Sequence, residues 1–262
     1  MLTVQHRPLG GPWKSGLLSQ HAYLSLIGDR DENQDRATVL VADGVSCLIV
    51  SDGMGGHAGG ALAAAAAVDS LSQSFLHARL PLMDPLGFLH LAIGQAHQAV
   101  VEIGHTVPIA ERPRATCAIC LVQNGAAYWA HVGDSRIYHL RQGKVVTRTR
   151  DHSHVEDLVR KGRITPVEAR RHPLRNFVEC CLGGSQELTE MTIGRRSPLE
   201  RGDILLLCSD GVWGAFDDED IGHPFRSGAP LDEAVKWLCQ SAVTATAPYS
   251  DNTTAAAMLW LD

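Results

Sequence analysis

The sequence has no long hydrophobic run and no excess of positive charge. No apolar stretch reaches the roughly 18 residues that a helix needs to cross a bilayer. The first 20 residues contain prolines, glycines and Lys14, and they lack the apolar core of a secretory signal peptide. The formal net charge of -6 argues against a general nucleic-acid binder. We therefore expect a soluble, cytoplasmic protein with neither nucleic acid nor membrane as a partner.

The sequence also lacks a zinc-binding pattern. No cluster of cysteine and histidine has the spacing of a zinc site. The chain contains seven cysteines, an odd number, and most of them lie inside apolar runs. Cys117 and Cys120 form a C-x-x-C motif, but they fall in a predicted strand, where residues three apart point to opposite faces. Buried, reduced thiols are therefore expected.

The composition fits one globular domain. The chain has 262 residues, of which 45% are hydrophobic and 20% charged, and this is enough for a substantial core. No internal repeat and no long linker divides it. We expect residues 1–19 to form a loosely attached leader and residues 20–262 to form a single domain.

Hairpin signals recur along the chain. Two-residue turns such as Asp43-Gly44 and Asn124-Gly125 separate short apolar runs. This pattern is a meander and not a β-α-β repeat, so it predicts antiparallel sheets. The expected strands are residues 21–27, 36–41, 45–50, 115–122, 126–132, 137–140, 145–147, 188–193, 204–208 and 253–261. The first three strands are expected to pair with one another.

Helical periodicity and helix-forming residues occupy other segments. The expected helices are residues 59–76, 85–104, 217–221 and 231–243. Residues 141–175 carry ten lysines and arginines against four acids, and Thr165 to Glu168 form a capping box. We expect a short basic flap at residues 151–176. It is either a solvated charged face or a surface that attracts an anionic substrate.

Five aspartates stand in loops beside apolar runs. A predicted buried strand is twice followed by Ser-Asp-Gly, at Asp52 and at Asp210. Asp251 precedes the last predicted strand, and Asp35 and Asp134 complete the set. Five carboxylates in one cleft would repel one another, so such a cluster is credible only as a site for two or more divalent cations.

Magnesium or manganese suits this set better than zinc, because hard cations prefer oxygen ligands. Gly53 can offer its backbone carbonyl, since no Cβ stands in the way. A pair of such ions lowers the pKa of a bound water and directs it at a phosphorus centre. Arg30, five residues before Asp35, is placed to grip a phosphate with its guanidinium fork.

These residues lie in five motifs that resemble those of a known family. The motifs are Arg30-x-x-Asn33-Gln34-Asp35, Ser51-Asp52-Gly53-Met54-Gly55-Gly56-His57, Val132-Gly133-Asp134-Ser135-Arg136, Cys208-Ser209-Asp210-Gly211 and Asp251-Asn252. In this order they resemble the motifs of the metal-dependent serine/threonine protein phosphatases of type 2C, most closely the bacterial branch. The resemblance spans roughly residues 21–261.

The resemblance implies an α+β fold, a four-layer α-β-β-α sandwich with two antiparallel sheets face to face and the metals at one end. It implies a serine/threonine protein phosphatase that hydrolyses phosphoserine and phosphothreonine monoesters by direct attack of a metal-bridging water. Two Mn(II) or Mg(II) ions would bind per site, with a weaker third. The substrates would be phosphoproteins of a serine/threonine kinase, and a monomer is expected.

The resemblance also implies roles for individual residues. Asp52 would bridge two metals. Asp210 and Asp251 would complete the first metal site, and the carbonyl of Gly53 would join the second. These four residues would form the centre of the site.

The remaining site residues would act around this centre. By the same resemblance, Asp35 would work mainly through metal-bound water, Asp134 would hold the weaker third ion and Arg30 would bind phosphate. Animal members carry a histidine directly after Asp-Gly, whereas this chain has Met54, as bacterial relatives commonly do. The proton donor to the leaving group is therefore either His57 or metal-bound water.

Two other interpretations fit parts of the sequence. Gly53-x-Gly55-x-x-Ala58 matches a dinucleotide-binding fingerprint, but that fold needs repeated β-α-β units and the chain shows hairpins. A catalytically silent phosphatase-like module that binds a phosphopeptide is the second alternative. Loss of a metal carboxylate would favour it, and none is missing.

Overall fold

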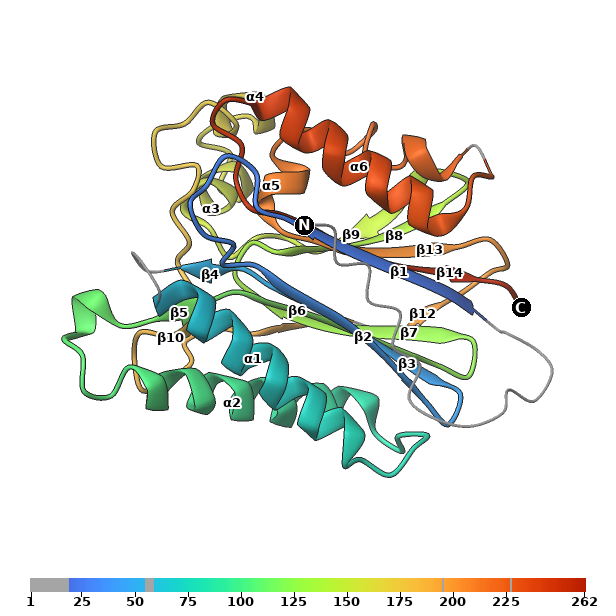
Figure 1. Ribbon diagram of the computed structural model, residues 1–262, viewed down its shortest axis with the longest axis horizontal. Coiled ribbons are helices and arrows are strands. Elements are labelled where there is room, and N and C mark those ends of the chain that lie inside the picture. The colour runs from blue at the N-terminus through green and yellow to red at the C-terminus, as the bar shows by residue number, and fades with distance from the viewer. Residues whose placement is uncertain (1–18, 55–58, 195, 227) are drawn as a thin grey trace.

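The computed structural model describes residues 19–54, 59–194, 196–226 and 228–262. Two antiparallel β-sheets lie face to face, and helices cover both outer faces (Figure 1). The four-layer α-β-β-α sandwich expected from the motifs is therefore confirmed. The expected leader, apart from Ser19, lies outside the described residues.

The first sheet joins the two ends of the chain. Its strands, in spatial order, are β1 (Ser19–Leu26), β14 (Thr253–Trp260), β13 (Ile204–Cys208), β8 (Arg136–Arg141) and β9 (Lys144–Arg148). All neighbours are antiparallel. The expectation that the first strand pairs with the next two is wrong, because β1 pairs along its whole length with β14, with Ser19 opposite Trp260.

The second sheet is built mainly from hairpins. Its strands are β11 (Thr192–Ile193), β7 (Ala126–Val132), β6 (Cys117–Gln123), β3 (Val45–Ser51) and β2 (Arg36–Ala42), with β12 (Ser197–Pro198) also paired to β7. Asp43 and Asn124 have φ angles of 47° and 51°, as the predicted two-residue turns require. The expected strand at 188–193 is reduced to β11. A small third sheet contains β10 (Leu182–Gly183), β5 (Arg114–Ala115) and β4 (Gly53–Met54).

Helices cover the outer face of each sheet (Figure 1). The helices are α1 (Gly59–Leu76), α2 (Pro85–Ile103), α3 (His154–Arg160), α4 (Pro166–Ala169), α5 (Asp210–Trp213) and α6 (Leu231–Thr246), with 3-10 turns η1 (Ile109–Glu111) and η2 (His223–Phe225). The expected helix at 217–221 is wrong. That segment forms turns, in which the Asp218 carboxylate accepts hydrogen bonds from Tyr138 and Arg148 of the first sheet.

Three apolar layers hold the sandwich together. One lies between α1, α2 and the second sheet, one between the two sheets, and one between α6 and the first sheet. Strand β3 shows the arrangement: Ile49 packs under the helices, whereas Leu48 and Val50 face the other sheet. Because both faces are buried, the central strands are continuous apolar runs. In the described part of the chain, no helix combines the length and apolarity needed to span a bilayer.

The cysteines are dispersed through these layers. All seven lie in the described part of the chain and all are free thiols. Cys117 belongs to the layer under α1 and α2, whereas Cys120 of the same strand belongs to the layer between the sheets. The C-x-x-C motif is therefore unable to act as a chelating or redox pair, as its position in a strand predicted. Burial raises the pKa of Cys117 to about 12.

We predict that the native protein reacts slowly with thiol reagents. Only Cys181 is partly exposed, so about one of the seven thiols should react rapidly, and all seven should react after unfolding. Titration with a chromogenic disulfide, with and without denaturant, measures both numbers. Rapid reaction of three or more thiols in the folded protein would contradict the packing described above.

Candidate active site

The five aspartates found in the sequence come from five separate loops and meet in one cluster. The connection from β1 to β2, strand β4 and helix α5 lie at the same end of the sandwich (Figure 1). At this end the pKa of Asp52 is raised well above its usual range, first by burial and then by the negative charges of Asp35, Asp210, Asp134 and Asp251. Asp52 therefore lies at the centre of the cluster.

Strand ends place these carboxylates. Asp52 follows β3, and its backbone is held to Thr116: the Asp52 N–H donates to Thr116 Oγ1 at 2.9 Å, and the Thr116 N–H donates to the Asp52 carbonyl at 2.8 Å. Asp210 is the first residue of α5, separated from β13 by Ser209 alone, and Asp35 directly precedes β2. Because Asp52 and Asp210 come just after the buried strands β3 and β13, their backbones cannot move away from each other.

The cluster carries more negative charge than buried groups normally retain. Burial raises the pKa of Asp35 to about 6 and that of Asp134 to about 7. Burial and the charges of its neighbours also raise the pKa of Asp210 well above its usual range. Full ionisation of the set at neutral pH therefore requires compensating positive charge.

Two unsatisfied oxygens support a cation site. Asp35 Oδ1 and Asp210 Oδ1 are buried and have no hydrogen-bond partner among the described residues. Such oxygens are costly unless an ion fills the gap. In the described ranges, no three acid, histidine or cysteine side chains are already grouped to hold a metal. The oxygen-rich donor set of the cluster fits Mg(II) or Mn(II).

Gly53 permits other backbone segments to approach β4 closely. A Cβ at this position would collide with the backbone of Gly60 at the start of α1 and would lie 2.8 Å from the Gln34 carbonyl oxygen. The first turn of α1 therefore packs directly against β4. The predicted substrate-binding residue His57 lies outside the described residues.

Arg30 lies at the edge of the cluster. Its Nη2 donates to Asp251 Oδ2 at 2.7 Å, and its side chain is 56% exposed. The other carboxylate oxygen of Asp251 accepts the Asn252 N–H at 2.8 Å. The structure thus brings the predicted phosphate-binding arginine into contact with one of the predicted metal ligands.

Comparison with known proteins agrees with this geometry. Residues 25–245 match the family model described as "Protein phosphatase 2C". The chain belongs to the protein phosphatase 2C family. Protein phosphatase PhpP of Streptococcus pneumoniae is 31% identical over 226 residues, which cover 84% of this chain and 90% of PhpP. The chain is therefore an enzyme of this family, related to its bacterial members.

Solved phosphatase structures share the fold. The serine/threonine phosphatase of Streptococcus agalactiae superposes with a TM-score of 0.84 at 28% identity, covering 93% of this chain and 100% of that one. The catalytic domain of serine/threonine protein phosphatase PstP, in complex with 2 manganese ions, gives a TM-score of 0.78 at 29% identity and covers 93% and 99%.

Asn252 has a structural role in the phosphatase site that its motif did not reveal. Its Oδ1 accepts the Gln34 N–H at 2.8 Å, and its Nδ2 donates to the carbonyls of Ile27 and Glu32 at 2.9 Å. These bonds tie the loop that carries Arg30 to the start of β14. In the sequence, Asn252 was visible only as the residue after the candidate ligand Asp251, and nothing indicated its hydrogen-bond partners.

Arg136 is a second residue whose role became clear only in three dimensions. It donates two parallel hydrogen bonds of 2.8 Å to Asp151 and stacks 3.7 Å above the ring of Trp213. Trp213 Nε1 in turn donates to the Asp134 carbonyl at 2.9 Å. Arg136 therefore connects the acidic cluster to Asp151, at the base of the predicted flap. Further along the same segment, the predicted capping box of Thr165 at the start of α4 is confirmed.

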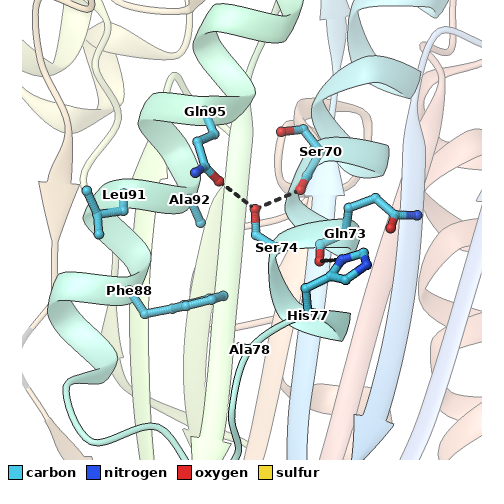
Figure 2. Close-up of a pocket in the computed structure, with 9 residues that line it drawn as sticks. All are labelled: Ser70, Gln73, Ser74, His77, Ala78, Phe88, Leu91, Ala92 and Gln95. Atoms are coloured by element: carbon cyan, nitrogen blue, oxygen red, sulfur yellow. Dashed lines mark hydrogen bonds between the residues drawn. The ribbon is translucent and has the colours of Figure 1, made fainter.

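A separate pocket lies between α1 and α2 (Figure 2). Its volume is about 600 Å³, and Phe88, Leu91 and His77 are among the residues that line it. Within the pocket, the Ser74 hydroxyl of α1 donates a hydrogen bond to Gln95 Oε1 of α2 at 2.9 Å. None of the clustered aspartates lines this pocket, so it is not the phosphatase site.

We predict that the metal-free phosphatase loses stability as the pH rises from about 4, the usual pKa of an aspartate, through about 7, the raised pKa of Asp134. Asp52 and Asp210 have raised pKa values in the folded state, so the fold keeps protons that the unfolded chain has already lost. Raising the pH removes these protons from the folded state, and the resulting repulsion between buried carboxylates lowers the free energy of unfolding. Thermal unfolding in the presence of a chelator should show a fall in Tm of at least about 2 °C.

The variant Asp52→Asn isolates the cause of this pH dependence. Without the central charge, the Tm in chelator should be higher than that of the native protein and should fall less with pH. Added Mn²⁺ should raise the native Tm more at the higher pH, because metal and protons compete for the same oxygens. A Tm that is constant or rises with pH in chelator would contradict the electrostatic description of the cluster.

Proposed function

We propose that this chain is a metal-dependent protein serine/threonine phosphatase that hydrolyses phosphoserine and phosphothreonine monoesters. The observation that carries the proposal is the cluster of five aspartates around Asp52, four of which have pKa values raised by burial and by neighbouring charge. None of the expected acids is absent from it. A catalytically silent binding module has no need to retain so unfavourable a set of charges.

The proposed ligands follow from position within the cluster. Asp52 interacts with every other acid and is proposed to bridge two ions. Asp210 and Asp251 are proposed to complete the first site, and the carbonyl of Gly53 to join the second. The PstP catalytic domain, which binds 2 manganese ions, supports two Mn(II) or Mg(II) ions as cofactors. Asp134 is proposed to hold a weaker third ion.

When bound, two such ions supply a hydroxide at neutral pH and neutralise charge on the phosphoryl oxygens. Asp35 is proposed to accept a hydrogen bond from the attacking water. Arg30 uses one nitrogen for Asp251 in this structure, and its other donors are available to fix two phosphate oxygens. Together these two residues would orient the water and the phosphorus for attack.

Several expectations from the sequence remain predictions. His57 is a proposed proton donor to the leaving group, with metal-bound water as the alternative. Phosphoproteins of a serine/threonine kinase are the proposed substrates, and a cytoplasmic monomer is the proposed form. The names of the relatives support phosphoprotein substrates as a class.

The proposed function is tested with phosphopeptides of one sequence that carry phosphoserine, phosphothreonine or phosphotyrosine. Phosphate release should require Mn²⁺ or Mg²⁺, stop with a chelator, and favour the first two peptides. An aryl phosphate provides a substrate without peptide contacts. Failure to release phosphate from any of these substrates at saturating Mn²⁺ would contradict the proposal.

The variant Asp52→Asn should lose more than about 100-fold in kcat. This exceeds the roughly 10- to 100-fold loss expected when only a hydrogen-bond partner of a metal ligand is mutated. It should still fold, because removing a crowded charge relieves repulsion. Steady-state kinetics and circular dichroism measure the two effects. Asp69→Asn is the matched control, since Asp69 is exposed on α1. Substantial turnover in the Asp52 variant would refute the bridging role.

The variant Arg30→Ala should mainly raise KM for the phosphopeptide, by about 10- to 100-fold, as expected from losing a charged hydrogen bond to phosphate. Arg30→Lys should recover only part of this loss, because lysine keeps the charge but not the fork. A variant in which kcat falls while KM is unchanged would show that Arg30 does not bind substrate.

A further inference from the structure

Two buried hydroxyl groups converge on one oxygen-bearing side chain of the cluster. Ser209 Oγ donates to Asp35 Oδ2 at 2.7 Å, and the same Oγ accepts the Thr254 N–H at 3.1 Å. The pKa of Asp35, raised overall by burial, is lowered in part by hydrogen bonding to the side chains of Ser209 and Thr254. Ser209 and Thr254 are completely buried, on neighbouring strands of the first sheet or directly after one. Neither residue had a role in the sequence analysis.

The direction of each hydrogen bond can be assigned. An ionised carboxylate only accepts, so the single proton of Thr254 goes to Asp35. Thr254 Oγ1 lies 2.7 Å from Ser25 Oγ, which must then donate to it. Ser25 Oγ in turn accepts from Asn33 Nδ2 at 2.8 Å. Asn33 Oδ1 accepts the Asp35 N–H at 3.1 Å, which closes a ring of four residues.

This ring leaves the two oxygens of Asp35 in different states. Oδ2 accepts a hydroxyl hydrogen bond, whereas Oδ1 is buried and has no hydrogen-bond partner among the described residues. The negative charge of Asp35 raises the pKa of Asp52, at the centre of the cluster, so the two carboxyls are neighbours. A carboxylate fixed through one oxygen presents the other in a constant direction. Oδ1 is therefore the oxygen available to the reacting groups.

We propose that Ser209 and Thr254 are positioning residues for the phosphatase reaction: the Ser209 hydroxyl holds Asp35 by Oδ2 and the Thr254 hydroxyl supports the same carboxylate, so that Oδ1 faces the attacking water. The inference rests on the proposed function and adds two residues to it. It also assigns the ring residues Asn33 and Ser25 a purpose, which is to fix the direction of the Thr254 proton.

Thr254 offers a matched pair of variants. Thr254→Val removes the hydroxyl and keeps the shape, whereas Thr254→Ser keeps the hydroxyl and removes a methyl group. Thr254→Val should lower kcat by about 10- to 100-fold with KM nearly unchanged, the usual cost of an outer-shell partner. Thr254→Ser should stay within about threefold of the native enzyme. The affinity for Mn²⁺, measured by calorimetry, should change by less than about threefold in both, because Asp35 acts on water rather than as a direct ligand.

A double-mutant cycle identifies the partner. In an Asp35→Asn background, Thr254→Val should cause little further loss of kcat, because the group it positions is already altered. Ser209→Ala should behave like Thr254→Val and provides a second route if one variant folds poorly. Ser46→Ala is the control: Ser46 is a buried hydroxyl that bonds to His21 at the opposite end of β3, and its loss should leave kcat unchanged.

The outcomes separate this inference from the proposed function. Absence of Mn²⁺-dependent turnover in the native protein overturns both. Normal native turnover with equal kcat in Thr254→Val and Thr254→Ser overturns only the positioning role. Effects of Asp35→Asn and Thr254→Val that simply multiply, or a loss of Mn²⁺ affinity as large as the loss of kcat, also overturn it.

Discussion

Mutual repulsion among buried carboxylates is the constraint on which this site depends. Four aspartates of the cluster have pKa values raised by burial and by neighbouring negative charge, and one oxygen of Asp35 and one of Asp210 have no hydrogen-bond partner among the described residues. A fold driven only by stability would not gather such groups. The arrangement becomes reasonable when divalent cations are the missing component, and the proposed phosphatase chemistry needs those same cations.

The sandwich resists this repulsion because each acid adjoins a rigid element. Thr116 holds the backbone of Asp52, Asn252 binds the loop before β2, and Arg136 joins Trp213 to Asp151, at the base of the predicted flap. These contacts are made by neutral or paired side chains, so they add no further negative charge. The hydroxyls around Asp35 follow the same rule, because they satisfy one oxygen without neutralising the acid.

Local signals predicted much of the fold, and long-range pairings did not. The helix at residues 59–76 and the hairpin at Asn124 were predicted closely, because propensity and turn chemistry are properties of adjacent residues. The pairing of β1 with β14 was missed because the sequence of neither strand indicates which strand it pairs with, and the two are more than 200 residues apart. The role of Ser209 was hidden for the same reason: it exists only once β13 and β14 are side by side.

The candidate ligands were recognisable because Ser-Asp-Gly after a buried strand occurs twice, whereas their supporting shell has no such signature. The central claim is that cations reside among these acids. Anomalous X-ray diffraction from crystals soaked in Mn²⁺ tests it most directly. We predict two strong anomalous peaks, both in contact with Asp52, with Asp210 and Asp251 beside one of them. Peaks located elsewhere, or none at Asp52, would contradict this account.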